Sequence, residues 1–125
     1  MDTKELGFLA ENIAARYLME QGYQVIARNY RKPWGEIDVI ATKAGVVCFV
    51  EVKANHRQFA GDFNPESRVN PRKLSKIIKT ASLYLEYELR RPGTGWQVDI
   101  VSVTFNKQAQ SANIKHFKNI AQDYS

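Results

Sequence analysis

Residues 35–41 read Gly-Glu-Ile-Asp-Val-Ile-Ala, and residues 48–53 read Cys-Phe-Val-Glu-Val-Lys. In both stretches, charged side chains interrupt a run of apolar residues that is typical of a buried strand. Burial of a carboxylate is unfavourable unless a cation or hydrogen bonds compensate for it. The two stretches therefore indicate a chemical site inside the sheet, and a bound metal ion is the first hypothesis that they favour.

The two stretches are expected to form a β-hairpin. Apolar strands are predicted at residues 36–42 and 46–54, and Ala44 and Gly45 lie between them in a segment typical of a tight turn. If these two residues form the turn, the pairing of the strands is symmetric about them. A three-residue turn would change this register, and only a compensating bulge would restore it.

The symmetric register brings four charged residues together. Asp38 then faces Glu51, Glu36 faces Lys53, and alternation places all four side chains on one side of the sheet. Directly opposed like charges destabilise a sheet. A hard cation such as Mg²⁺ would compensate, because it binds one or two protein carboxylates and leaves room for phosphate oxygens. Lys53 at the edge of that site would stabilise charge on a phosphoryl group or orient the attacking water.

Two further acids have two interpretations each. Glu36 borders the turn at residues 32–35, so it is either an accessory acid of the metal site or an exposed partner of Lys53. Glu11 lies near the apolar stripe of the first predicted helix, where it is either a solvated residue or an acid beside the metal.

The rest of the chain predicts two helices and three more strands. They are a helix from residue 3 to about 21, a strand at 24–30, a helix from 71 to about 91, a strand at 96–105 and a short edge strand at 113–117. The first three strands should form an antiparallel meander, and the helix before the fourth favours a parallel crossover. The prediction is an α/β fold with a mixed sheet flanked by helices. Residues 1–125 should form a single domain, with its core at about 3–105 and a C-terminal extension at 106–125.

Composition narrows the kind of site and partner. Cys48 is the only cysteine, and His56 and His116 are far apart in the sequence, which argues against a cysteine- or histidine-based zinc site. A net charge of +5 favours a polyanionic partner, either nucleic acid or an anionic membrane surface. The sequence has no basic helix with an apolar face and no apolar N-terminal stretch, so we expect a cytoplasmic protein without a membrane partner.

Basic residues gather in segments near the predicted site. They come from the first strand and its turn, from the polar loop at residues 55–70 and from the second helix, and they could contact phosphates: Arg28, Arg31, Lys32, Arg57, Arg72, Lys73 and Lys76. Trp34 accompanies the first group, and Phe59 and Phe63 lie in the loop. The alternative interpretation is an ordinary solvated helix face. Together these residues favour nucleic acid over other partners.

The hairpin motif, Gly-Glu-Ile-Asp-Val-Ile-Ala followed by Phe-Val-Glu-Val-Lys, resembles the bacterial YraN-like proteins. That family is placed in the PD-(D/E)xK nuclease superfamily, close to the archaeal Holliday-junction resolvases. The resemblance covers nearly the whole domain and includes Glu11, residues 28–31, Lys73 and residues 98–101. It implies a restriction-endonuclease-like αβββαβ core.

The resemblance also implies roles for individual residues. Asp38, Glu51 and the backbone carbonyl of Val52 would bind Mg²⁺ or Mn²⁺, Lys53 would be the catalytic lysine, and Glu11 would be an accessory helix acid. Asn55 and Gln97 depart from the family pattern, because arginine is usual at both places.

Two functions follow as hypotheses. The first is a metal-dependent endonuclease that hydrolyses DNA phosphodiester bonds, with branched DNA as the substrate that the resemblance suggests. The second is a non-catalytic nucleic-acid-binding or adaptor protein on a nuclease fold. Because resolvase-like relatives commonly act as dimers, the resemblance also suggests a homodimer.

Overall fold

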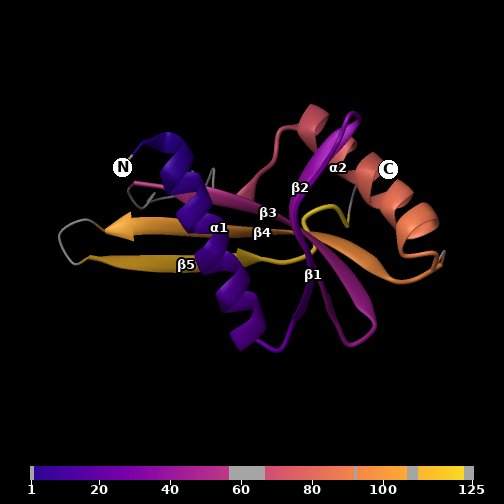
Figure 1. Ribbon diagram of the computed structural model, residues 1–125, viewed down its shortest axis with the longest axis horizontal. Coiled ribbons are helices and arrows are strands. Elements are labelled where there is room, and N and C mark those ends of the chain that lie inside the picture. Colours follow the sequence, from indigo (N-terminus) through magenta and orange to yellow (C-terminus); the bar gives the residue numbers. More distant parts are fainter. Residues whose placement is uncertain (1, 57–66, 92, 107–109, 123–125) are drawn as a thin grey trace.

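The computed structural model describes residues 2–56, 67–91, 93–106 and 110–122 (Figure 1). Its elements follow in the order α1 (Thr3–Glu20), β1 (Gln24–Lys32), β2 (Gly35–Lys43), β3 (Val46–Asn55), α2 (Pro71–Leu83), η2 (Tyr84–Glu88), β4 (Trp96–Asn106) and β5 (Ser111–Phe117). The sheet has five strands in the order β1-β2-β3-β4-β5. Only β3 and β4 run parallel among these neighbours. The predicted mixed sheet and restriction-endonuclease-like αβββαβ core are therefore confirmed.

Helix α1 covers one face of the sheet. Its first turn is capped by Asp2, whose Oδ1 accepts a hydrogen bond of 2.8 Å from the Glu5 amide. The helix is anchored by Ala10, Ala14 and Leu18, which are buried with residues of β2, β3 and β4. Small alanines let the helix backbone approach the strands closely. Glu11 is therefore held near the sheet by the packing of its neighbours in the helix.

Helix α2 packs on the opposite face. The Asn70 side chain accepts hydrogen bonds from the amides of Arg72 and Lys73, and Pro71 occupies the first helical position. Farther along, Ala81 and the first residues of η2 bury against Ile37, Ile40, Val47 and Phe49. The N-terminal half of α2 is mostly exposed, and Figure 1 shows it beside the β1–β2 hairpin.

The second helix ends differently from the prediction, which placed a continuous helix to about residue 91. The α-helix stops at Leu83, and one π-helical turn, η2, continues to Glu88. In that turn the Leu89 amide bonds to the Tyr84 carbonyl at 2.9 Å, a wider loop than in an α-helix. The wider turn lets the consecutive residues Tyr84 and Leu85 both enter the core.

The central hairpin has the predicted register. Ala44 and Gly45 both have positive φ angles, of 51° and 79°, as a two-residue type I′ turn requires. The β2–β3 ladder runs from Lys43–Val46 to Val39–Val50 and ends there. The predicted pairs of Asp38 with Glu51 and of Glu36 with Lys53 would continue this register, but they are not part of the ladder.

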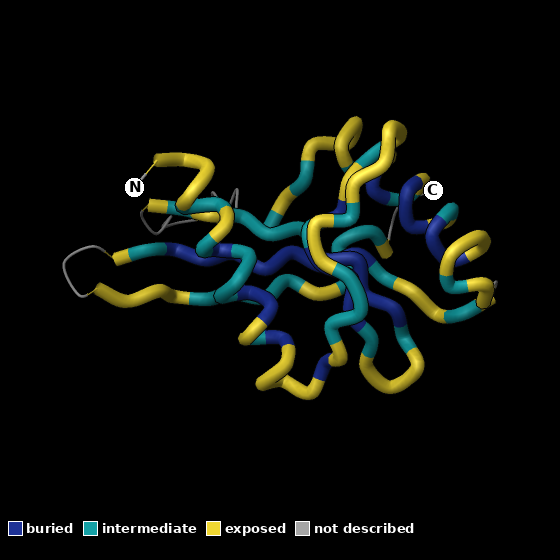
Figure 2. The backbone as a smooth tube through the Cα atoms, viewed as in Figure 1, coloured by how far each residue is buried: buried dark blue, intermediate teal, exposed yellow. Residues whose placement is uncertain are grey.

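The two strands part because each keeps a different neighbour beyond that point. β2 stays paired with β1 as far as Gly35, whereas β3 stays paired with β4 as far as Asn55. The buried strand centres and the exposed outer end of the β1–β2 hairpin are visible in Figure 2. We call the opening between residues 35–38 of β2 and residues 51–55 of β3 the strand fork.

Strand β5 completes the sheet beyond the predicted core. It runs from Ser111 to Phe117, antiparallel to β4, so the predicted edge strand exists and begins two residues earlier than expected. Its His116 reaches the buried Asp99 of β4. Within the described ranges, none of the helices has both the length and the apolar character needed to cross a membrane.

Candidate metal centre at the strand fork

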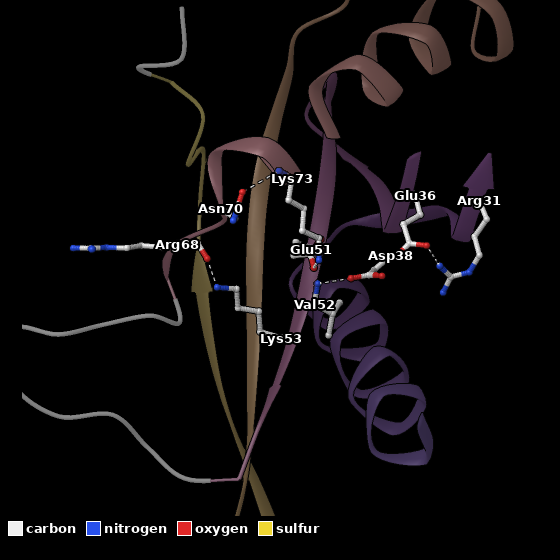
Figure 3. A network of polar contacts seen from close by, with 9 residues as sticks. All are labelled: Arg31, Glu36, Asp38, Glu51, Val52, Lys53, Arg68, Asn70 and Lys73. Carbon is white, nitrogen blue, oxygen red and sulfur yellow. Dashed lines mark hydrogen bonds and ion pairs between the residues drawn. The ribbon is translucent and has the colours of Figure 1, made fainter. Parts of the chain in front are cut away.

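Asp38 lies at the point where β2 and β3 separate. Its Oδ2 accepts a hydrogen bond of 2.8 Å from the backbone amide of Val52, which takes the place of a ladder bond (Figure 3). Burial raises the pKa of Asp38 above its ordinary range, and the hydrogen bond from Val52 and the Lys73 charge only partly offset this effect. The structure therefore holds this carboxylate in a place that disfavours its charge.

Glu51 reaches the fork from β3. Only 10% of its side chain is exposed, and its Oε1 lies 2.6 Å from the Lys73 ammonium of α2. Burial raises the pKa of Glu51, and the neighbouring charge of Asp38 raises it further. Burial lowers the pKa of Lys73, but its hydrogen bond and charge interaction with Glu51 raise that pKa by more. The two acids thus repel each other, and Lys73 offsets that repulsion at Glu51.

Glu11 approaches Asp38 from α1. Burial raises the pKa of Glu11, and the charge of Asp38 and a hydrogen bond with that side chain raise it further. The charges of Arg31 and Arg28 act in the opposite direction. Glu11 is half-buried and interacts with the predicted site.

Two other predicted residues lie differently from expectation. Lys53 donates a hydrogen bond to the backbone carbonyl of Arg68, and Figure 3 shows its side chain directed away from Asp38. Glu36 forms an ion pair with Arg31 of the neighbouring strand β1, with which it is in register. The expected contact between Glu36 and Lys53 is therefore replaced by these two partners. The reason is that β2 follows β1 rather than β3 beyond Val39.

The fork offers oxygen donors that suit a hard cation. Asp38 and Glu51 supply carboxylate oxygens, which Mg²⁺ and Mn²⁺ prefer. In an extended strand, the amide and carbonyl of one residue point toward the same side of the strand. Because the Val52 amide points at Asp38, its carbonyl also faces the fork. A divalent cation there would favour the charged forms of both acids, whose pKa values are raised mainly by burial.

The donor set is limited to these groups. In the part of the chain that the structure describes, no three histidine, cysteine or acidic side chains form a cluster able to hold a metal by themselves. A metal site at the fork therefore depends on two carboxylates, a backbone carbonyl and water. Such a set is usual for Mg²⁺, which keeps several water ligands.

The predicted basic residues fall into two groups around the fork. On β1, Arg28 donates to Asn12 of α1 at 2.6 Å, and Lys32 lies 3.3 Å from Glu88. On α2, Arg72 and Lys76 are exposed, and Lys73 turns inward to Glu51. Arg57, Phe59 and Phe63 lie outside the described residues. Arg28 thus lies on the α1 side of the sheet, whereas Lys32 lies with the cations of α2 on the other side.

Asn55 and Gln97, which depart from the family pattern, both form hydrogen bonds. Gln97 donates a hydrogen bond of 2.8 Å to Asp99, and Asn55 donates one of 2.6 Å to Ser102. Both amides therefore bind β4 side chains in the sheet.

Sequence reasoning gave Asp99 and His116 no role, but the structure makes them the centre of a buried network. Asp99 is fully buried and accepts hydrogen bonds from His116, from Gln97 and from the Asn119 amide, at 2.8, 2.8 and 2.9 Å. The other ring nitrogen of His116 lies 3.0 Å from the Tyr17 hydroxyl. An acid inside an apolar strand was the available signal for Asp99. The separation of His116 in sequence hid its role.

Comparison with known proteins places the chain in a family. The model of the uncharacterised protein family UPF0102 matches residues 10–103, which include Glu11, Asp38, Glu51 and Lys73. A UPF0102 protein of Fervidobacterium nodosum is 36% identical over 94% of this chain and 82% of its own length. One from Campylobacter fetus is 37% identical over 92% of each chain, and one from Wolinella succinogenes is 45% identical over 69% and 75%. These matches agree with the YraN-like resemblance, and the chain belongs to the UPF0102 family.

Proposed function

We propose that this protein is a Mg²⁺- or Mn²⁺-dependent endonuclease that hydrolyses phosphodiester bonds in DNA. The observation that carries the proposal is the pair of half-buried carboxylates at the strand fork, where the pKa of each is raised by burial and where Asp38 raises that of Glu51. A protein gains no stability from such a pair. Acids whose pKa is raised by burial and by a neighbouring charge are typical of functional sites.

The fork residues have distinct tasks in this reaction. Asp38, Glu51 and the Val52 carbonyl hold the ion, which would polarise the scissile phosphate and lower the pKa of the attacking water. The Val52 amide fixes the orientation of Asp38 through its 2.8 Å hydrogen bond. Glu11, beside Asp38, is placed to accept a proton from water or to bind it.

Two lysines are candidates for contact with the phosphate of the substrate. The resemblance assigns the catalytic lysine to Lys53, which lies on the same strand as Glu51. Lys73 is the amine already in contact with Glu51, at 2.6 Å. When an ion and substrate occupy the fork, we expect Lys73 to exchange this carboxylate for a phosphate oxygen, and Lys53 to leave the Arg68 carbonyl. Either ammonium would stabilise charge developing on the phosphoryl group.

DNA is the proposed substrate because the cations lie beside the acids. Lys32, Arg72 and Lys76 are exposed and would neutralise phosphates on either side of the scissile bond. They also compensate for the repulsion between DNA and the acidic fork.

The test is cleavage of single-stranded, duplex, flapped and four-way-junction DNA in Mg²⁺, Mn²⁺ or EDTA. We expect metal-dependent cleavage by the native protein, reduced roughly 100-fold or more by Asp38→Asn or Glu51→Gln. The control is Glu86→Gln, which changes an exposed acid on η2 and should cleave like the native protein. Circular dichroism would verify that all variants are folded.

The outcomes separate the two functional hypotheses. DNA binding without cleavage of any substrate and with any metal would refute the nuclease and favour a non-catalytic nucleic-acid-binding protein. Cleavage that survives both substitutions at the fork would refute the site. Analytical ultracentrifugation with and without a junction substrate would test the expected homodimer.

A further inference from the structure

A groove lies between the β1–β2 turn and the first half of α2. Its volume is about 810 Å³, and its lining residues include Lys32, Trp34, Glu36, Arg72, Lys73, Lys76 and Lys79. Figure 1 shows the two elements side by side at this end of the sheet. The groove is thus formed by two segments that are far apart in the sequence and are brought together by the packing of α2 on β2.

The walls of the groove are strongly basic. Five of its lining side chains are cationic and one, Glu36, is acidic. The charge of Glu36 is already paired with Arg31. Arg72, Lys76 and Lys79 follow one another at helical spacing along α2, and all three are exposed. A row of exposed cations along a groove is suited to the phosphates of a nucleic-acid strand.

Trp34 gives the groove an apolar, planar surface. The residue is 41% exposed and lies in the tight turn between Lys32 and Gly35. Gly35 fixes that turn against α2, because a Cβ atom at this position would overlap the Thr80 hydroxyl and lie 3.4 Å from the Lys76 carbonyl. The indole is therefore presented by a closely packed turn. Aromatic rings held among cations bind the faces of unpaired bases by stacking.

The groove leads to the metal centre through one residue. Lys73 lines the groove, and its ammonium lies 2.6 Å from Glu51 at the fork. A strand whose base stacks on Trp34 and whose phosphates follow α2 would thus pass toward the carboxylates. A regular duplex hides its base faces, so only an unpaired strand can use the ring and the cations together.

We propose that this groove binds an unpaired stretch of nucleic acid, with one base stacked on Trp34 and the backbone along Arg72, Lys76 and Lys79. The delivery of that strand to Asp38 and Glu51 rests on the nuclease function proposed above. Binding in the groove does not depend on it. The proposal narrows the substrate to DNA that carries a single-stranded segment beside the cleavage site.

Tryptophan fluorescence can observe the stacking directly. Trp34 and Trp96 are the only tryptophans, so the Trp96→Phe protein reports on Trp34 alone. We expect an oligothymidine of 15 nucleotides to quench the fluorescence of Trp34 in EDTA, where no metal-dependent cleavage occurs. A blunt hairpin duplex with the same number of nucleotides should bind more weakly and leave the emission nearly unchanged. Absence of quenching by the single strand, or equal quenching by the duplex, would overturn the proposal.

Substitutions distinguish the contribution of base stacking to the binding affinity from that of the cationic side chains. Trp34→Leu should weaken binding of the single strand about 5- to 100-fold without changing the salt dependence, whereas Trp34→Phe should recover part of the affinity. Lys76→Gln or Lys79→Gln should instead lower the slope of log affinity against log salt by about 0.7 each. The matched control is Lys4→Gln, an exposed lysine at the start of α1 that does not line the groove. Unchanged affinity in Trp34→Leu would refute the stacking role.

The same measurements distinguish this proposal from the nuclease function. If oligothymidine quenches Trp34 but no DNA is ever cut, the groove proposal is supported and the nuclease proposal is refuted. If duplex DNA is cut and no strand changes the fluorescence of Trp34, the nuclease proposal is supported and the groove proposal is refuted. Vesicles of anionic phospholipid that shift the Trp34 emission when oligonucleotides do not would identify a membrane surface as the ligand and overturn the proposal.

Discussion

Asp99 and Asp38 are both aspartates on strands of one sheet, but their surroundings differ. Asp99, on β4, is fully buried and accepts three hydrogen bonds, from a histidine, a glutamine and a backbone amide. Asp38, on β2, accepts one backbone hydrogen bond and has other acids, Glu11 and Glu51 among them, as neighbours. Burial alone would raise the pKa of Asp99, but its hydrogen bonds lower that pKa by more, whereas the pKa of Asp38 is raised.

The difference shows how to distinguish a structural acid from a functional one. Folding stabilises the charge of Asp99, so this residue contributes to the stability of the β4–β5 region through His116 and Asn119. Folding destabilises the charge of Asp38, so other interactions in the core must offset that unfavourable free energy. A buried acid whose charge the fold does not stabilise is a candidate for binding a cation.

The largest expected effect follows from removing the charge of Asp99. In Asp99→Asn, one carboxylate oxygen becomes an amide nitrogen, which cannot accept from all three donors. We expect the free energy of unfolding at neutral pH to fall by about 2–3 kcal/mol. Urea denaturation followed by circular dichroism measures this change. The difference from the native protein should shrink in acid, because the stabilisation by a carboxyl with a lowered pKa is lost as pH falls through that pKa. Unchanged stability at neutral pH would contradict the structural role.

The next effect concerns the metal. An ion that binds only the folded protein stabilises it by about 1.4 kcal/mol at ten times its dissociation constant. We therefore expect Mg²⁺ or Mn²⁺ to raise the melting temperature of the native protein and to leave that of Asp38→Asn almost unchanged. Ca²⁺ soaked into crystals should appear beside Asp38 and Glu51. An equal thermal shift in both proteins would place the ion elsewhere.

In the absence of metal, Asp38→Asn should change the stability of the protein in the opposite direction from Asp99→Asn. Asp38→Asn keeps an oxygen that can accept from the Val52 amide and removes a charge that burial disfavours. We therefore expect urea denaturation to show that the metal-free variant is more stable than the native protein at neutral pH. For an acid with a raised pKa, stabilisation is complete below its ordinary pKa and is lost as pH rises through the raised value. The gain in Asp38→Asn should therefore disappear in acid, and a gain independent of pH would point to another cause.

The sequence contains enough local information to predict the hairpin itself. Ala44 and Gly45 favour a two-residue turn, the alternation of apolar residues identifies the strands, and together they set Val39 opposite Val50. Each predicted helix and strand is present because each has a local signal, such as the Asp2 cap of α1 or the Asn70–Pro71 start of α2, although some ends differ. The resemblance to the YraN-like proteins was confirmed by the family match.

The geometry of the site could not be predicted in the same way. Whether Asp38 continues the β2–β3 ladder depends on competition between β1 and β3 for the end of β2, which is a tertiary effect. Lys73 was predicted to contact phosphate, but its approach to Glu51 depends on how α2 packs on the sheet. The π-helical turn after Leu83 and the Asp99–His116 contact likewise arise from packing between distant segments.

The smallest effect compares the two lysines near Glu51. The ion pair of Lys73 with Glu51 involves a lysine whose side chain is half exposed, so Lys73→Met should change the stability by only about 0.5 kcal/mol. It should nevertheless raise the pKa of Glu51, because both the hydrogen bond and the nearby positive charge disappear. Lys53→Met should raise that pKa less, since the Lys53 ammonium bonds to the Arg68 carbonyl and interacts with Glu51 only through its charge. Carbon-13 NMR titration of the Glu51 carboxyl in both variants measures the difference. A larger shift in Lys53→Met would show that Lys53, rather than Lys73, is the main cation at the fork in solution.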